Sequence, residues 1–178
     1  MGEVMEKEML LERALESFSG AYDIVRDAEV AARRVDALAQ LRAINQKYVL
    51  SKKHVLWEAN AFEHALFLCE GELSADVVND WFAFLTHEAE APLAHPDAKY
   101  PPEGHMYTYL TLIFLCDGVQ DEAVKAIKKA KFTKNYCFSL RGWATARVLA
   151  VDIERGRVYT NAAGREMERH FKRLLEAR

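Results

Sequence analysis

The sequence predicts an α+β fold in which one mixed or antiparallel β-sheet is flanked by helices, within a single domain of residues 1–178. Helical and strand-like hydrophobic spacings alternate in the order helix, β-rich segment, helix, strand, helix, β-hairpin, helix. A mixed order of this kind favours one sheet with helices packed over it. The length of 178 residues suits one domain with a full hydrophobic core, and no internal repeat points to a solenoid.

The strongest strand signal lies within Lys134–Asn161. Ala146–Ile153 runs apolar on both faces, so we expect this strand to be buried in the middle of the sheet. Glu154–Arg157 predicts a turn and Val158–Thr160 a short returning strand. Gly142 stands in strand-like sequence, where a glycine indicates a bulge or a close approach of another backbone segment.

Helical spacing of apolar side chains predicts four amphipathic helices. Ser19-Gly20 is expected to end the first helix, and Ser74 is the expected N-cap of the second. The four helices are expected at residues 3–18, 75–90, 121–131 and 162–177.

Residues 22–46 carry two competing patterns. The stretch AARRVDALAQLRAINQ is rich in strong helix formers. The same stretch alternates between apolar and polar residues from Val35 to Ala43, which is typical of a half-buried strand. The two patterns leave strand and helix open over residues 31–46.

Further strand-like runs precede and follow the second helix. In one of them Phe62, His64 and Leu66 share a face, because side chains alternate along a strand. Glu70–Glu72 and Asp117-Gly118 are predicted as turns at the ends of two runs. The runs cover residues 48–53, 54–59, 61–69 and 105–116.

Pro92–Pro102 is the one stretch that reads as a long loop. It is polar and proline-rich, and at about a dozen residues it exceeds the usual connection between elements. Long loops on a rigid scaffold often carry function. We therefore expect a lid or a binding loop here.

Charge is distributed unevenly along the chain. Residues 60–118 carry 1 Lys/Arg against 10 Asp/Glu, whereas residues 119–178 carry 14 against 7. Such asymmetry marks either a partner surface or two segments that pair with each other. Because both segments are amphipathic and neither is a charge run, we favour internal pairing.

Composition and motifs exclude several classes of protein. No apolar run approaches the roughly 20 residues that a membrane helix needs, and the acidic N-terminus does not resemble a signal peptide. Three widely spaced cysteines indicate free thiols in a reducing cytoplasm. There is no glycine-rich phosphate loop and no GxSxG elbow. We expect a cytoplasmic protein with no cofactor and no membrane partner.

Four stretches of the chain resemble an uncharacterised prokaryotic family, a domain of unknown function. The resemblance extends over nearly the whole length, and no activity is assigned to that family. It implies a β-rich N-terminal half, with two strands over residues 22–46, and it implies no catalytic residues. The stretches are LSKK at Leu50–Lys53, HMYTYLTL at His105–Leu112, LRGWA at Leu140–Ala144 and VYTNAAGRE at Val158–Glu166.

The order of elements also resembles the restriction-endonuclease-like core. That fold carries an Asp on its second strand and a Glu-x-Lys on its third, which together bind a divalent metal. Asp36 falls at the position of the first acid, and Glu58 or Glu63 at the position of the second. Neither glutamate is followed two positions later by lysine, so a shared fold would carry re-sited chemistry or none.

Six histidines are scattered along the chain without HExxH, CxxC or another close ligand pair. His64 beside Glu63, and His105 at the start of a strand, are candidate metal ligands if they converge with Asp36 or Glu58. Carboxylate and imidazole together would suit Mn²⁺ or Zn²⁺. Isolated histidines are more often ordinary core or surface residues, and we expect that here.

The basic C-terminal third interleaves cations with aromatic rings, a pattern that could grip phosphates and stack on bases. The aromatic residues mostly alternate as sheet core, and Arg141 and Arg147 could pair with the acidic middle segment. The candidate binding residues are Lys134, Arg141, Trp143, Arg155 and Arg157.

The absence of a catalytic motif predicts a non-catalytic binding or assembly domain that self-associates into a homo-oligomer. A divergent metal-dependent nuclease using Asp36, Glu58 or Glu63 is one alternative. A nucleic-acid-binding protein of low sequence preference is another.

Overall fold

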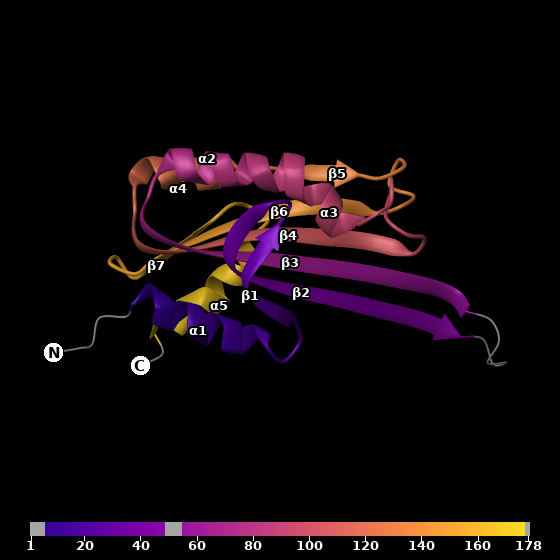
Figure 1. Ribbon diagram of the computed structural model, residues 1–178, viewed down its shortest axis with the longest axis horizontal. Helices are drawn as coiled ribbons and strands as arrows, with labels where there is room; N and C mark the ends of the chain where they lie inside the picture. The colour runs from indigo at the N-terminus through magenta and orange to yellow at the C-terminus, as the bar shows by residue number, and fades with distance from the viewer. Residues whose placement is uncertain (1–5, 49–54, 177–178) are drawn as a thin grey trace.

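The computed structural model describes residues 6–48 and 55–176, with the side chains of residues 44–48 and 55–59 left out (Figure 1). Its helices are α1 (Lys7–Phe18), α2 (Ala75–Phe84), a π-helical turn (Leu85–Ala89), α3 (Glu90–Ala94), α4 (Asp121–Lys129) and α5 (Arg165–Glu176). Its strands are β1 (Asp23–Val30), β2 (Arg33–Tyr48), β3 (Val55–Leu73), β4 (His105–Val119), β5 (Thr133–Asn135), β6 (Trp143–Asp152) and β7 (Arg157–Thr160).

The strands within the described ranges form one mixed sheet of seven, in the order β1-β2-β3-β4-β6-β5. β1, β2 and β3 pair antiparallel, whereas β3, β4 and β6 run parallel to one another. β5 and β7 pair antiparallel with opposite ends of β6. The predicted α+β class is confirmed. The prediction left open a mixed or an antiparallel sheet, and the sheet is mixed.

Helices cover both faces of the sheet. α2, α3 and α4 lie on one face, and α1 and α5 lie on the other (Figure 1). β2 and β3 extend well beyond α1 and α5, so neither of these helices covers their far ends (Figure 1). The two faces therefore offer different environments to residues of the same strand.

The centre of the sheet is buried on both sides, as predicted for Ala146–Ile153. Leu112 and Val148 face the α2–α4 layer, and Ile113 and Leu149 face α1 and α5. All four side chains are fully buried. Burial of one large aliphatic side chain contributes roughly 1.5–3 kcal/mol, so these strands are the main hydrophobic support of the fold.

Residues 33–46 form a strand, which resolves the two competing patterns in favour of the strands that the family resemblance implied. β1 and β2 are joined by Ala31-Ala32, with φ of 45° and 65°. Two positive φ angles are the mark of a type I′ hairpin turn, which normally carries Asn or Gly. β2 then pairs with strands on both sides, and this pairing overrides the helix propensity of its alanines.

Two predicted turns are wrong. Glu70–Glu72 lies inside β3 and Asp117-Gly118 lies inside β4, because the parallel pairing of these strands continues to Leu73 and Val119. A neighbouring strand satisfies the backbone N–H and C=O groups there. Local turn residues carry no information about that neighbour.

The predicted second helix is longer than expected and irregular. Ser74 caps it as predicted, by accepting a hydrogen bond from the Val77 N–H. The helix passes through the π-helical turn and continues as α3 to Ala94. The predicted Pro92–Pro102 loop therefore begins inside α3, and bends and turns follow it. π-Turns inside helices are often found at functional sites.

The helices predicted at 121–131 and 162–177 are confirmed within three residues at each end, and the first helix, which begins at Lys7, ends at Phe18 as predicted. Helix ends are the least certain boundaries in any assignment. The predictions for residues 3–5, Leu50–Lys53, His54 and Ala177 lie outside the described residues.

The turn that joins β5 to β6 brings its backbone close to β4. Gly142 has a φ of +72°, and a Cβ at this position would lie 2.1 Å from the Met106 carbonyl oxygen. The predicted close backbone approach at Gly142 is confirmed. The prediction that aromatic residues here are sheet core holds for buried Tyr136 and is wrong for Phe138, which is fully exposed at the tip of the turn.

Candidate functional site

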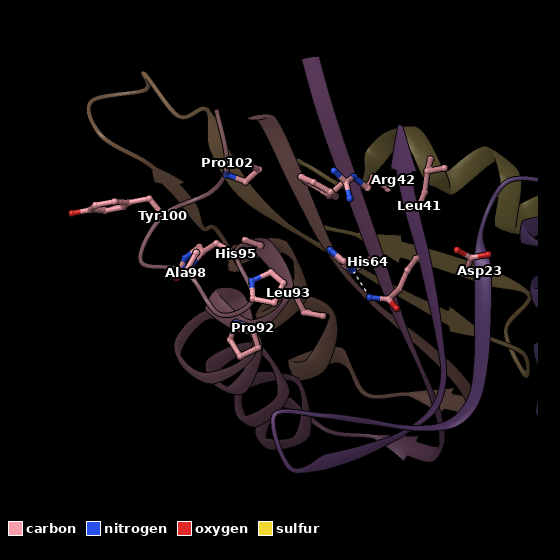
Figure 2. Close-up of a pocket in the computed structure, with 14 residues that line it drawn as sticks. Asp23, Leu41, Arg42, His64, Pro92, Leu93, His95, Ala98, Tyr100 and Pro102 are labelled. Carbon is pink, nitrogen blue, oxygen red and sulfur yellow. Dashed lines mark hydrogen bonds between the residues drawn. The ribbon is translucent and has the colours of Figure 1, made fainter. Parts of the chain in front are cut away.

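A cavity of about 490 Å³ lies between the sheet and the segment that follows the π-turn. Strands β1, β2 and β3 supply one wall, and α3 with the loop after it supplies the other (Figure 2). The wall of the sheet includes Asp23, Gln40, Arg42, Phe62 and His64. The opposite wall includes Pro92, Leu93, His95, Ala98, Tyr100 and Pro102. The predicted binding loop thus borders the cavity, although its function stays a prediction.

The strand register explains why these polar side chains meet. Gln40 pairs with His64 across β2 and β3, and Arg42 pairs with Phe62 two residues further along. Residues two apart share a face of a strand. All four side chains therefore point toward the α2–α4 layer, where they line the cavity.

His64 is the most deeply buried ionisable group of this lining, with 6% of its surface exposed. The Gln40 amide Nε2 donates to His64 Nδ1 over 3.0 Å. Because an amide nitrogen can only donate, Nδ1 accepts, and the neutral ring carries its proton on Nε2. Within the described residues Nε2 makes no hydrogen bond of normal geometry, and the Leu93 carbonyl of the opposite wall is a weaker polar contact of the ring.

Burial decides the protonation state of His64. It lowers the pKa of this side chain to about 4, while the backbone carbonyl of Leu93 opposes part of the shift. The ring is therefore neutral at pH 7. The cavity contains a buried N–H donor that is oriented by Gln40 and carries no charge.

Arg42 supplies a cation on the same wall. Its guanidinium carbon lies 5.5 Å from the centroid of the Phe62 ring, within cation–π range. No carboxylate among the described side chains, which do not include that of Glu58, lies within ion-pair distance of it. Arg42 is exposed, so its charge stands at the opening of the cavity and His64 lies deeper.

The opposite wall is held by a buried carboxylate. Glu90, 3% exposed, accepts hydrogen bonds from Lys134 Nζ at 2.6 Å and from the Tyr136 hydroxyl. His95 Nε2 lies 3.7 Å from Glu90 Oε1, and His95 Nδ1 donates to the Ala98 carbonyl over 2.8 Å. Burial, and then the bond to Glu90, raise the pKa of Tyr136. This network fixes the start of the loop over the cavity.

The end of the same loop is tied to the β5–β6 turn. Arg141 donates to the Pro101 carbonyl over 3.2 Å and pairs with Glu103 at 3.4 Å. His105 Nδ1 donates to the Arg141 carbonyl over 2.6 Å. Both ends of the loop are thus anchored to residues of the basic C-terminal third.

The three predicted acidic residues do not gather at one point in the described side chains. The Asp36 carboxylate accepts from the Cys69 N–H at 2.7 Å. Glu63 lies opposite Leu41, five residues along β2 from Asp36, which is roughly 16 Å at about 3.3 Å per residue. The side chain of Glu58 lies outside the described residues. The described residues contain no group of three His, Cys, Asp or Glu side chains able to hold a metal ion.

The two candidate metal ligands also lie apart. His64 pairs with Leu110 of β4, and His105 starts β4 five residues earlier. Both nitrogens of His105 are engaged, by the Arg141 carbonyl and by the Thr108 hydroxyl at 2.8 Å. Burial lowers the pKa of His105. Of the two, only His64 lines the cavity.

The candidate binding residues of the C-terminal third divide into separate places. Lys134 and Arg141 support the cavity loop. Arg155 donates to the Val119 carbonyl over 2.6 Å and pairs with buried Asp152 at 3.4 Å. Trp143 lies on the face opposite the cavity, 5.9 Å from the Tyr107 ring. Arg157 is exposed at the start of β7.

Ion pairs join the acidic middle segment to the basic end, as the favoured interpretation of the charge asymmetry predicted. Three such pairs are Lys134–Glu90, Arg141–Glu103 and Arg147–Glu63. Glu90 is buried, and Arg147 is 5% exposed. Three of the ten acidic residues of the middle segment therefore pair with the basic end.

Two of the stretches on which the resemblance rests turn out to be structural. In VYTNAAGRE, buried Asn161 accepts hydrogen bonds from the Val148 and Gly164 N–H groups. Its amide nitrogen donates to the Ala130 and Ala146 carbonyls. In LRGWA, the glycine is required by the close approach to β4.

Sequence reasoning missed Gln40, Arg42, Phe62 and His95 as members of one site. The signal for part of it was present, because the alternation placed Phe62 and His64 on one face. The pairing of β2 with β3, which adds Gln40 and Arg42, cannot be found from spacing within one strand.

No helix within the described ranges is long and apolar enough to cross a membrane.

The chain was compared with protein families, with curated proteins and with solved structures. No curated protein and no solved structure matches the chain, so the likeness to the restriction-endonuclease-like fold stays a prediction. Residues 6–173 match the family described as Domain of unknown function (DUF8052), which confirms the predicted resemblance to an uncharacterised domain. The chain belongs to this family.

Proposed function

We propose that this protein is a non-catalytic binding domain whose ligand is a small, mainly apolar organic molecule held in the His64 cavity. One observation carries the proposal: a buried, oriented N–H donor that makes no hydrogen bond of normal geometry with the described atoms faces a cavity of about 490 Å³. Ligand pockets typically combine an apolar lining with a few well-placed polar groups.

The unpaired donor gives a ligand a free-energy advantage. Leaving a buried polar group without a hydrogen bond costs about 1–3 kcal/mol. A ligand that offers an acceptor to His64 Nε2 recovers this loss, and its body replaces water against the proline and leucine side chains of the opposite wall. Water can also satisfy Nε2, but it gains nothing from the apolar side chains of the opposite wall, whereas an apolar ligand does.

The surroundings of His64 support binding more than catalysis. A general base is usually oriented by a carboxylate that stabilises its protonated form. Here the orienting group is the neutral amide of Gln40, and a pKa of about 4 makes His64 a weak base at neutral pH. The arrangement suits recognition of a hydrogen-bond acceptor.

The alternatives have less support. A metal-dependent nuclease would need its acids in one coordination sphere, and Asp36 and Glu63 lie far apart. Binding of nucleic acid through the C-terminal third would need free cations, whereas Lys134, Arg141 and Arg155 hold carboxylates.

A ligand screen by thermal shift tests the proposal. We expect neutral aromatic and aliphatic fragments to raise the Tm of the wild-type protein, and the His64→Leu variant to lose that response. His170→Gln, on the opposite face of the sheet, is the matched control and should respond as wild type does. The proposal fails if no fragment stabilises the wild-type protein, or if His64→Leu responds equally.

We also propose that the domain self-associates through one apolar end. Four of the six large hydrophobic side chains exposed within the described ranges gather there: Tyr100, Met106, Phe138 and Leu140. Gly142 packs on Met106, and Arg141 bonds to Pro101, so the β5–β6 turn and the cavity loop form one surface. A second copy can use this surface reciprocally about a twofold axis.

Sedimentation velocity over a concentration series tests self-association. We expect a dimer for the wild-type protein and a monomer for the double variant Phe138→Ser, Leu140→Ser. Val25→Thr, an exposed hydrophobic residue of the distant edge strand β1, serves as control and should stay dimeric. A wild-type mass of one chain at all concentrations would refute this assignment.

We propose a cytoplasmic location in a prokaryotic cell. All three cysteines are free thiols, as expected in a reducing compartment. Burial raises the pKa of the Cys69 thiol to about 12, so little reactive thiolate forms. Fractionation of the source cells tests the location, and recovery from an extracytoplasmic fraction would overturn it.

A further inference from the structure

We infer that the ligand of the cavity is an organic acid, with its carboxylate bound by Arg42 and a second oxygen acceptor bound by His64. This inference rests on the proposed function, and it adds the chemical class of the ligand. It follows from the charges that line the cavity and from the direction of their hydrogen bonds.

Arg42 is one of several arginines for which the described side chains include no carboxylate within ion-pair distance, and among these it is the one that lines the cavity. Other arginines hold acidic partners, such as Glu12 for Arg26 and Asp80 for Arg33. Arg42 instead lies over the Phe62 ring. A guanidinium in this position presents a planar fork of donors, which suits the two oxygens of a carboxylate.

Asp23 marks where an anion would not bind. It is exposed and pairs with Gln40 across β1 and β2. Asp23 is a diagonal neighbour of Arg42 on the same face of the sheet, and its negative charge repels a carboxylate from the β1 side of the cavity. The lining therefore favours one orientation of an acid, with its charged end at Arg42.

The tautomer of His64 sets the second requirement. Nε2 carries the proton and can only donate, so the deep end of the ligand must be an acceptor such as a carbonyl oxygen. Gln40 and Arg42 lie two residues apart, and diagonal positions across neighbouring strands are about 7–8 Å apart. A single ring with substituents at opposite ends spans a comparable length, and the Phe62 ring offers a surface for it.

Four probes separate the two contacts: 4-acetylbenzoate, 4-acetylbenzamide, 4-isopropylbenzoate and 4-isopropylbenzamide. They differ only in the anionic charge and in the second acceptor. Binding is measured by titration with ligand-observed NMR on the wild-type protein and on the Arg42→Gln and His64→Leu variants. Arg34→Gln, an exposed arginine of the same strand, is the control for lost surface charge.

We expect the wild-type protein to bind 4-acetylbenzoate about tenfold more tightly than either single-change probe, since one such contact contributes about 1.4 kcal/mol. Arg42→Gln should abolish the preference for acid over amide and keep the preference for acetyl over isopropyl. His64→Leu should do the reverse. Arg34→Gln should keep both preferences.

Equal affinity of wild type for acid and amide, or an unchanged acid preference in Arg42→Gln, would refute the inference. No detectable binding of all four probes would also refute it. These outcomes leave the cavity-binding proposal intact if neutral fragments still stabilise the wild-type protein and not His64→Leu. Failure of that screen instead removes the proposed function itself.

Discussion

Glu63 and His64 are neighbours on β3, and their side chains point to opposite faces of the sheet. They differ in the hydrogen-bond and ion-pair partners that they find there. Glu63 accepts a hydrogen bond from the Tyr22 hydroxyl over 2.8 Å and lies 3.5 Å from Arg147. Arg147 also pairs with Glu166 and lies 3.3 Å from the centroid of the Tyr109 ring. His64, one residue along, has one bonded nitrogen and one that makes no hydrogen bond with the described atoms.

The difference separates a structural polar cluster from a binding site. On the α1–α5 face, the charge of Arg147 is matched by two carboxylates from β3 and α5, so the cluster ties a helix to the sheet although Arg147 Nε itself makes no hydrogen bond with the described atoms. On the cavity face, His64 is oriented and left open. Burial of a polar group is unfavourable unless it is paired, so a group left open beside a cavity indicates a partner outside the chain.

The largest loss of stability is expected from a substitution in the β5–β6 turn, which supports the loop over the cavity. Gly142→Ala should destabilise the fold by at least about 4 kcal/mol, because the new Cβ meets the Met106 carbonyl and the φ is positive. Chemical denaturation measures the loss. Gly156→Ala is the matched control, since Gly156 has a φ of +61° and nothing within 4 Å of the added Cβ; it should lose only about 1 kcal/mol. Equal losses would contradict the role of the close approach.

The second-largest loss of stability is expected when Arg147 is removed from its cluster with Glu63 and Glu166 on the other face. Arg147→Met should lower the free energy of unfolding by about 3 kcal/mol, because a charge paired in the interior is removed and Glu63 keeps only Tyr22. Urea denaturation at low salt measures it. Arg157→Met, at an exposed arginine, should change stability by less than about 0.5 kcal/mol. A loss below about 1 kcal/mol for Arg147→Met would show that the cluster is not a structural tie.

The two faces should also differ in their response to pH. The pKa of His64 is about 4 in the folded state, against an ordinary value of 6.5, so between these values the unfolded chain binds a proton that the folded chain does not. The free energy of unfolding should fall as the pH is lowered from 6.5 to 4, by roughly 3 kcal/mol in total, and stay constant above 6.5. Subtracting the pH profile of His64→Leu isolates this contribution from those of His105 and His170. Identical profiles would contradict it.

The smallest expected change in the free energy of unfolding is a gain, whereas Arg147→Met is expected to cause a loss. His64→Leu should raise the free energy of unfolding at about pH 7.5 by about 1 kcal/mol, because an unpaired buried donor is replaced by an apolar side chain. Stability gained at the expense of binding is common at functional sites. Denaturation of the ligand-free protein measures the gain. A loss above about 1 kcal/mol would mean that His64 is a structural group like Arg147.

Prediction from the sequence succeeded where local pattern and burial agree. Ala146–Ile153 was identified as a central strand because a short run that is apolar on both faces is typical of the middle of a sheet. Gly142 was recognised as a close approach, although nothing in the sequence named Met106 as its neighbour. The turns at Glu70–Glu72 and Asp117-Gly118 were wrong, since polar residues with glycine also occur inside paired strands.

The candidate site was only half visible in the sequence. The loop that borders the cavity and the shared face of Phe62 and His64 were both predicted. Arg42 and Gln40 were not, because they come from another strand, and the partner of a strand depends on register. Asp36 is a candidate metal ligand only through a likeness in the order of helices and strands. That order alone does not bring side chains together.

By itself the sequence determined the α+β class, the buried central strand, the amphipathic helices and the membership of a family without assigned activity. These follow from residue periodicity and local motifs, which are properties of each segment alone. Only the tertiary structure decided which strands β2 pairs with, that the Glu63 carboxylate is paired and that His64 Nε2 makes no hydrogen bond with the described atoms. Neighbouring side chains of one strand diverge because the sheet has two faces, and what covers each face is supplied by distant parts of the chain.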